Sequence, residues 1–193
     1  MACSTIIQGI SSSCGSNLPG VAEVWIGKFG DYTFTYEYLM DDTDPDNPVQ
    51  VLDDDGNPIP ISISGATLGT GADVMQKFEF RKNTASATNT LTVNDNGSNF
   101  FENAINMYFP KQDTNKRLSV MSLVQGETCA LVKDKNGLYW LYGKDEYLSV
   151  SEGTVETGAA PTDNNGYNIT LSASERLLPL QVASAAVSTM TGV

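Results

Sequence analysis

Histidine is absent from this chain of 193 residues. Its absence excludes Ser–His and Cys–His nucleophile systems, histidine general bases and histidine-rich zinc sites. Pairs of carboxylates can hydrolyse glycosides without histidine, but no such pair lies in an aromatic context at the end of a predicted strand. We therefore expect no enzymatic activity, no cofactor and no bound metal.

Long apolar runs and a regular cysteine pattern are also missing. No run approaches the ~18 residues that a membrane helix needs, and the N-terminus has no basic leader, so we expect neither membrane insertion nor a signal peptide. Cys3, Cys14 and Cys129 form an odd set without metal-ligand spacing. Free thiols in a reducing cytoplasm are favoured over a Cys3–Cys14 disulfide, which stays open.

Cations are scarce: 11 Lys and Arg stand against 23 Asp and Glu, which gives a formal net charge of −12. Because proteins hold nucleic acid mainly through Lys and Arg contacts to phosphates, this composition argues against stable DNA binding. Two explanations of the acidity are equally favoured: the protein lines a path along which DNA passes without adhering, or the charge serves only solubility.

Much of the acidity falls in one segment, where prolines alternate with aspartates. Proline cannot donate to a sheet ladder and neighbouring carboxylates repel one another, so residues 40–58 are predicted to form an exposed loop. Residues 53–57 also offer oxygen ligands beside a glycine, but the calcium-loop pattern that ends in a bidentate Glu is missing, and a solvated turn is favoured. The aspartates are Asp41, Asp42, Asp44, Asp46, Asp53, Asp54 and Asp55.

Alternation of apolar and polar residues predicts strands over most of the chain. In residues 31–39, tyrosines and Phe34 occupy one face and Thr33, Thr35 and Glu37 the other. Residues 21–29 and 31–39 should form a long hairpin or one bent strand, and residues 74–81 and 88–94 a second hairpin. The remaining strands are expected at 59–63, 117–125 and 128–133.

One helix is predicted at about residues 98–109. Phe101, Ala104, Ile105, Tyr108 and Phe109 follow the spacing of a single apolar stripe on a helix, and Pro110 ends it. Ser98 or Asn99 can cap its N-terminus. The stripe is expected to pack across an open sheet face.

The last third of the chain consists of short strand patterns separated by turn signals. Residues 137–143 read GLYWLYG, residues 153–158 read GTVETG and residues 163–175 read DNNGYNITLSASE. Asn136 and Gly137 predict a type I′ hairpin turn, since both residues tolerate positive φ. Tyr167, Ile169 and Leu171 alternate with polar residues, which is typical of a strand with one buried face.

The order and spacing of these three segments resemble the C-terminal part of bacteriophage tail tube proteins. The resemblance runs over about residues 131–182, and an N-terminal segment with Gly9, Ile10, Cys14 and residues 19–26 resembles the same family more loosely. It implies two packed antiparallel sheets, one helix, and long hairpins that join six subunits into rings. Stacked rings would form the tail tube, which contacts other tail proteins and conducts DNA. The protein would then be located in the virion tail and assembled in the host cytoplasm.

The expected fold is accordingly mainly β, an antiparallel sandwich or partly open barrel with one flanking helix. Residues 1–20 are expected to be an N-terminal arm, 21–183 a single tail-tube-like β domain, and 184–193 a C-terminal tail that is loose outside an assembly. Long alternating strands have exposed edges, and pairing with further copies would close them.

Three strand faces are candidates for the lumen of such a ring, because each alternates polar with apolar residues. In a monomeric sandwich the same faces would simply point outward. The aspartate loop is the candidate for ring stacking. The lumen candidates are Thr33, Thr35 and Glu37; Thr88, Thr90 and Thr92; and Lys77, Glu79 and Arg81.

Other classes of protein fit part of the sequence. A neck, terminator or baseplate protein of the same kind of virion would share the composition but form a single ring. A carbohydrate-binding jelly roll would expose tryptophan, whereas Trp25 and Trp140 lie within apolar strand patterns that predict burial.

Overall fold

The computed structural model describes residues 18–41, 49–52, 56–95, 98–160 and 162–193. Strands dominate these residues, and the predicted mainly-β class is confirmed. The strands are β1 (Val21–Lys28), β2 (Tyr32–Tyr38), β3 (Met40–Asp41), β4 (Val49–Gln50), β5 (Pro60–Leu68), β6 (Gln76–Phe78), β7 (Ala85–Val93), β8 (Asn99–Pro110), β9 (Thr128–Asp134), β10 (Tyr139–Tyr142), β11 (Ser149–Glu156), β12 (Gly166–Glu175) and β13 (Leu180–Val182). The helices are α1 (Thr114–Gln125) and α2 (Ser184–Thr191).

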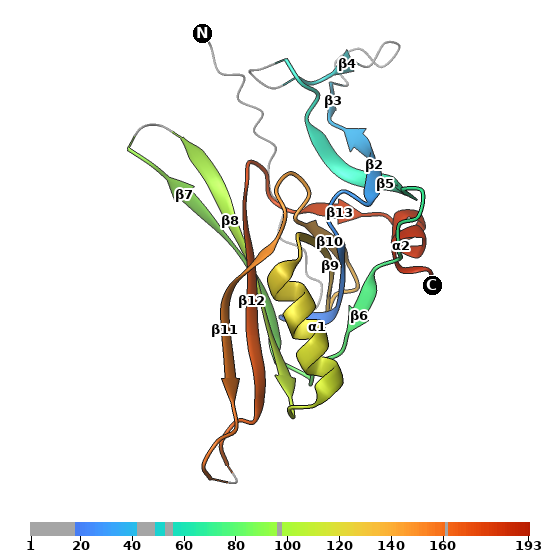
Figure 1. The fold of residues 1–193 in the computed structure, drawn as a ribbon. Coiled ribbons are helices and arrows are strands. Elements are labelled where there is room, and N and C mark those ends of the chain that lie inside the picture. The colour runs from blue at the N-terminus through green and yellow to red at the C-terminus, as the bar shows by residue number, and fades with distance from the viewer. Residues whose placement is uncertain (1–17, 42–48, 53–55, 96–97, 161) are drawn as a thin grey trace.

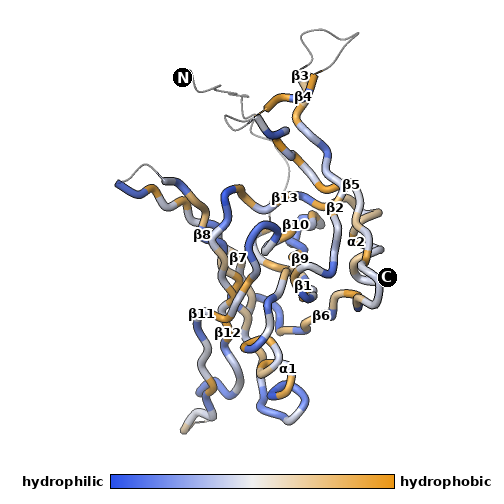
Figure 2. The backbone as a smooth tube through the Cα atoms, turned by 45° about the horizontal axis from the view of Figure 1, so that its top comes forward, coloured by the Kyte–Doolittle hydropathy of each residue, from blue (hydrophilic) through white to orange (hydrophobic). Residues whose placement is uncertain are grey.

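Two large sheets build the body (Figure 1). One has seven strands in the order β2-β5-β13-β10-β9-β1-β6, and the other has four in the order β11-β12-β8-β7. Neighbouring strands are antiparallel except β13 and β5, which run parallel. A two-stranded ribbon, β3–β4, continues beyond β2 and β5 and lies at the opposite end of the molecule from the start of α1 (Figures 1 and 2).

The seven-stranded sheet is buried on both faces because its strands alternate between two apolar clusters. In β9, Ala130 and Val132 enter the cluster shared with the four-stranded sheet, whereas Cys129 and Leu131 enter the cluster behind it. Ile105 and Leu171 of the four-stranded sheet complete the first cluster. The core between the two sheets therefore fixes which face of the four-stranded sheet remains open.

The helix predicted at about 98–109 is wrong, since these residues form β8. β8 pairs with β12 from Phe101 to Pro110, and with β7 on its other side from Asn99 to Met107. Residues 103, 105, 107 and 109 are buried while their neighbours are not, which is the period of a strand. The spacing of apolar residues in this segment fits a helix as well as a strand. Pairing with the neighbouring strands selects the strand, because strand propensity depends strongly on tertiary context.

The strand predicted at 117–125 is also wrong, since these residues belong to α1. Its apolar residues surround the helix instead of forming one stripe: Leu123 is buried, whereas Leu118, Met121 and Val124 are exposed. The signal for this helix lies at its start. The Asp113 carboxylate accepts a hydrogen bond from the amide of Lys116 at 2.8 Å, as an N-cap residue does.

Two of the predicted hairpins are not formed, and a third has a turn of another type. β1 pairs with β9 and β6, and β2 with β5, so residues 21–39 form no hairpin. β7 pairs with β8 and not with the segment before it. The β9–β10 hairpin is confirmed, but of Asn136 and Gly137 only the glycine has a positive φ, 90°, so the turn is not type I′.

The C-terminal segment is ordered against the body, contrary to the loose tail predicted for 184–193. Ala186 and Met190 of α2 are fully buried in the rear cluster, and the Met75 amide donates to the Met190 carbonyl at 2.8 Å. The small size of the residues in this segment suits close packing of a short helix. The predicted arm at 1–20 lies almost entirely outside the described residues.

Replacing Met190 with alanine is expected to destabilise the fold by about 2–5 kcal/mol, because it removes a fully buried side chain and leaves a cavity. Chemical denaturation of the purified protein measures this change. Val193→Ala is the control, since Val193 is 93 % exposed. Equal stability of the two variants would contradict the packing of α2.

Candidate functional site

The open face of the four-stranded sheet carries mostly polar side chains, and the register of the strands defines which residues belong to it. In each strand, residues that point away from the core alternate with residues that enter it. The Asn106 amide donates to the Thr170 hydroxyl at 3.0 Å across this face. The register places on it Ser86, Thr88, Thr90, Thr92, Phe100, Glu102, Ala104, Asn106, Tyr108, Asn168, Thr170, Ser172, Ser174, Ser149, Glu152, Thr154 and Glu156.

This open face is acidic without any compensating cation. None of the strands β7, β8, β11 and β12 contains Lys or Arg. Glu102, Glu152 and Glu156 point outward with hydroxyl and amide groups between them. A phosphate chain near this face would meet no fixed positive charge in the sheet, so the surface is poorly suited to binding nucleic acid.

Both edges of this sheet lack a partner strand within the described residues. β11 pairs only with β12, and β7 only with β8. Adjacent strands alternate in direction across the order β11-β12-β8-β7, so the two edge strands run opposite ways. A second copy placed beside the first can therefore join β11 to β7 as an antiparallel pair, and repetition of that step preserves the pattern.

The four-stranded sheet is longer than the part of it that packs against the seven-stranded sheet, so some residues on its core side are exposed at the strand ends. Leu91 and Val93 near the end of β7 are 54 % and 66 % exposed, and Val155 near the end of β11 is 57 % exposed. Leu91 stands opposite Phe101, and Val155 opposite Tyr167. The β7–β8 and β11–β12 hairpins project at opposite ends of the molecule (Figure 1). Each thus offers apolar surface that a neighbouring copy can cover.

A buried polar cluster holds this sheet against the loop that follows β10. The Glu175 carboxylate is 3 % exposed and accepts hydrogen bonds from the amides of Lys144 and Asp145 at 2.6 and 3.0 Å. Its other oxygen accepts from the Asn103 amide nitrogen at 2.5 Å. The Asn103 carbonyl oxygen is buried without a partner. Beside them, burial raises the pKa of Tyr142 despite its hydrogen bond to Asn89.

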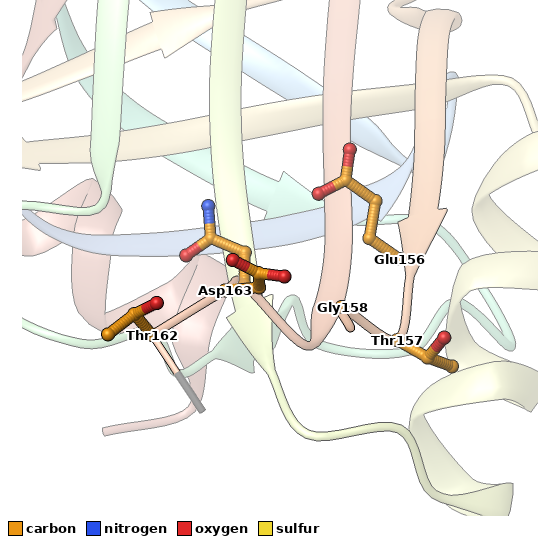
Figure 3. A pocket seen from close by; sticks show the side chains of 6 residues that line it. Glu156, Thr157, Gly158, Thr162 and Asp163 are labelled. Carbon is orange, nitrogen blue, oxygen red and sulfur yellow. The ribbon is translucent and has the colours of Figure 1, made fainter. Parts of the chain in front are cut away.

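The β11–β12 hairpin ends in an open hollow lined by residues 156–158 and 162–164 (Figure 3). The Asp163 carboxylate accepts hydrogen bonds from the amides of Ala159 and Ala160, both at 2.8 Å, and these bonds lower its pKa. The carboxylate is therefore used to shape the turn. We assign no ligand to this hollow.

The lumen candidates predicted from sequence lie on three separate surfaces. Thr33, Thr35 and Glu37 are exposed on β2, at one edge of the seven-stranded sheet, where the Ser62 hydroxyl donates to Glu37 at 2.5 Å. Lys77 lies on β6 at the opposite edge and pairs with Glu23 at 2.7 Å. Exposed Glu79 and Arg81 follow β6 outside any strand, so Lys77, Glu79 and Arg81 do not form one strand face.

Of the three predicted sets, only the threonines of β7 belong to the open face. Thr88, Thr90 and Thr92 point outward from β7. Sequence reasoning missed β8, β11 and β12 as parts of the same surface, because β8 was predicted to be a helix. One feature of the sequence could have linked these strands to one surface, since residues 83–110 and 145–175 contain no Lys or Arg.

The aspartate loop lies mostly outside the described residues. Asp42, Asp44, Asp46, Asp53, Asp54 and Asp55 are not described, and Asp41 ends β3. The base of the loop is held by backbone hydrogen bonds that continue the β2–β5 ladder, from Leu39 to Ile59 at 2.9 Å and from Val51 to Leu39 at 2.9 Å. The solvated turn favoured over a calcium site at 53–57 therefore stays a prediction, as do the free thiols favoured over a Cys3–Cys14 disulfide, because residues 53–55 and these two cysteines lie outside the described ranges.

The described ranges contain no group of three or more acidic or cysteine side chains placed to hold a metal ion. No helix in them is long and apolar enough to cross a bilayer. Cys129 is a buried free thiol, and burial raises its pKa to about 12.

Comparisons with models of known families, with curated proteins and with solved structures find no match for this chain.

Glu175→Ala is expected to destabilise the protein by about 3 kcal/mol, because the buried Asn103 amide and the partly buried amides of Lys144 and Asp145 lose their acceptor. Glu175→Gln should cost less than about 1 kcal/mol, since its oxygen still accepts from the two amides and its nitrogen can donate to Asn103. Denaturation curves measure both, with exposed Glu152→Ala as control. A glutamine variant as unstable as the alanine variant would contradict this account of the cluster.

Proposed function

We propose that this protein is a structural subunit of a ring, and that rings of six copies stack into a bacteriophage tail tube that conducts DNA. In this proposal the chain is not an enzyme, and its partners are further copies of itself and other proteins of the virion tail. The resemblance of residues 131–182 to tail tube proteins supports it, and so do the edges and the open face of the four-stranded sheet.

The observation that carries the proposal is the alternation of strand directions across a sheet with two unpaired edges. An even number of alternating strands lets β7 of one copy pair antiparallel with β11 of the next, all the way around a closed ring. Closure removes free edges, which otherwise promote uncontrolled aggregation. It would also place the exposed Leu91, Val93 and Val155 near neighbouring copies.

The size of such a ring suits a channel. Six copies of a four-stranded sheet would close a barrel of roughly 24 strands, with a circumference of about 115 Å at the ~4.8 Å strand spacing before tilt. Barrels of ~16–18 strands already enclose an aqueous channel. The seven-stranded sheet would then lie outside the barrel, since the core between the sheets occupies its outer face.

The open face of the four-stranded sheet would line the lumen. It carries hydroxyls, amides and the carboxylates of Glu102, Glu152 and Glu156, with no cation in any of its strands. Fixed negative charge repels phosphates within the ~8 Å Debye length of physiological salt. Thr88, Thr90 and Thr92 remain lumen candidates, whereas β2 and β6 would lie outside the barrel.

Assembly through β7 and β11 predicts a specific pattern of crosslinks. We expect single cysteines introduced along β7 (residues 88–92) and β11 (residues 150–155) in one chain to form intermolecular disulfides, in a background with Cys3→Ser and Cys14→Ser. Oxidation should give a ladder that ends at six subunits on a denaturing gel. Cysteines at Thr35 on β2 and Gln76 on β6 are the control pair and should not give this ladder.

Negative-stain microscopy of the same samples distinguishes the candidate assemblies. Stacked tubes support the tail tube, whereas isolated rings at every concentration support a neck, terminator or baseplate ring. A protein that stays monomeric by sedimentation and forms no ladder contradicts both.

Adding cations to the open face should convert a passive surface into a binding one. Thr90→Lys with Ser172→Lys is expected to leave rings intact, because both positions point away from the core, and to raise retention of duplex DNA in a filter assay. The gain should fall steeply with added salt. The control, Thr33→Lys with Thr67→Lys on β2 and β5, adds equal charge outside the proposed lumen. Equal retention by the two double variants would contradict the assignment of the lumen.

A further inference from the structure

Strand β6 forms one edge of the seven-stranded sheet, and helix α1 lies beside it (Figure 1). The space between them is an open groove of about 1220 Å³, which we call the β6–α1 groove. The buried side chains of Ile26, Phe109 and Leu123 contribute to its lining. Leu118 and Val74 also line it and are 59 % and 37 % exposed, so apolar surface in the groove remains uncovered.

Hydrogen bonds fix both walls of the groove. The Asp113 carboxylate caps the start of α1, and the Phe29 amide donates to the Glu127 carbonyl just after its end at 3.0 Å. On the other side, β6 pairs with β1, and the Met75 amide before it donates to the Met190 carbonyl at 2.8 Å. The groove therefore exists before any partner binds, which lowers the entropic cost of filling it.

One wall of the groove is a strand edge. Within the described residues, β6 pairs with β1 and has no strand on its other side. Gln76, Lys77 and Phe78, which make up β6, all line the groove. Because an unpaired edge is a template for one more strand, an extended segment that entered the groove could continue the sheet.

The groove is acidic. Carboxylates from four separate connections line it, and none of them forms an ion pair within the described residues. They are Asp31, Asp73, Glu79 and Glu127. Of the three lysines that line it, Lys77 pairs with Glu23 at 2.7 Å. Lys116 pairs with Asp113 at 3.4 Å, which leaves Lys28 against the carboxylates, and this balance favours a cationic occupant.

This chain supplies no suitable occupant of that charge. Residues 1–17 contain no Lys or Arg, and neither do residues 29–76. Most cations of a second copy lie in residues 77–82 and 111–117, which build or adjoin the same groove, or in the β9–β10 hairpin inside the sheet. A second copy also carries a net charge of −12, so it is repelled by an acidic groove.

We infer that the β6–α1 groove binds an extended segment of another protein, in which apolar side chains alternate with Lys or Arg. The segment pairs with the free edge of β6 and adds a strand to the sheet. Because side chains of a strand alternate between two faces, one row covers the apolar lining at Phe109 and Leu118 while the other meets the carboxylates.

The dimensions of the groove set the length of this segment. Helix α1 has 12 residues, which at ~1.5 Å rise per residue is a wall of about 18 Å, and about five or six extended residues span that distance. Neither β7 nor β11 contributes a residue to the groove. The binding therefore goes beyond the proposed ring and does not depend on it.

Titration with a designed peptide tests the inference. The probe is a fluorescein-labelled peptide of three Val-Lys repeats, and its anisotropy is followed as the full-length chain is added. We expect saturable binding that weakens with added salt, and no binding of the matching Val-Glu peptide. A Ser-Lys peptide of the same length keeps the charge without the apolar row and should bind at least about tenfold more weakly.

Variants of the groove locate the site. Glu79→Lys with Glu127→Lys should weaken binding of the Val-Lys peptide at least about tenfold, because it reverses charges that line the groove. Glu146→Lys with Glu152→Lys is the matched control, since it changes the net charge equally at exposed positions outside the groove. Ser122→Trp should also weaken binding, because it fills the groove without changing its charge. All five positions are exposed, and denaturation curves check that each variant folds.

Hydrogen exchange shows whether the peptide adds a strand, since bound peptide should protect amides within residues 76–78. The absence of saturable binding, equal weakening in the groove and control variants, or binding without this protection overturns the inference. Tighter binding of a peptide of residues 1–17 assigns the groove to the chain itself, and loss of peptide binding when rings form assigns it to a second copy; both results also overturn it. Absence of rings contradicts the proposed function and leaves this binding intact.

Discussion

The pairing of β8 with β12 is the contact on which the rest of the structure depends. It runs through ten consecutive residue pairs, from Phe101 opposite Glu175 to Pro110 opposite Gly166. Because side chains alternate along both strands, this register decides at once which residues enter the core and which face outward. A shift of one residue would turn Ile105, Met107, Ile169 and Leu171 to the solvent and bury the polar row, so one register alone satisfies both faces.

That register also accounts for the two properties on which the proposed assembly rests. It leaves β7 and β11 as edges of opposite direction, and it gathers the hydroxyl, amide and carboxylate groups of four strands on one side. The fixed core on the other side prevents the sheet from curling closed within one chain. Its edges remain available, and apolar residues beyond the covered region make solvent exposure of those edges costly. Pairing with further copies is a physical resolution of both problems.

Local sequence patterns predict a strand correctly where polar and apolar residues clearly alternate. They fail where the spacing of apolar residues fits a helix as well as a strand. Strands β1, β2, β9, β10 and β12 follow from alternation and turn residues, as expected. Residues 98–109 satisfy helical spacing as well as strand alternation, and only the pairing with β12, more than fifty residues away, decides between them. Helix α1 was missed for the converse reason, since its apolar residues have no single face. α2 was missed because its small residues resemble a tail until the rear cluster that receives Met190 is known.

The candidate surfaces show the same division between local and long-range information. The scarcity of cations in residues 83–110 and 145–175 is visible in the sequence. Its consequence is not, since it depends on those two segments forming one sheet. The sequence sets how many acidic and basic residues are present, and the topology sets which of them share a surface.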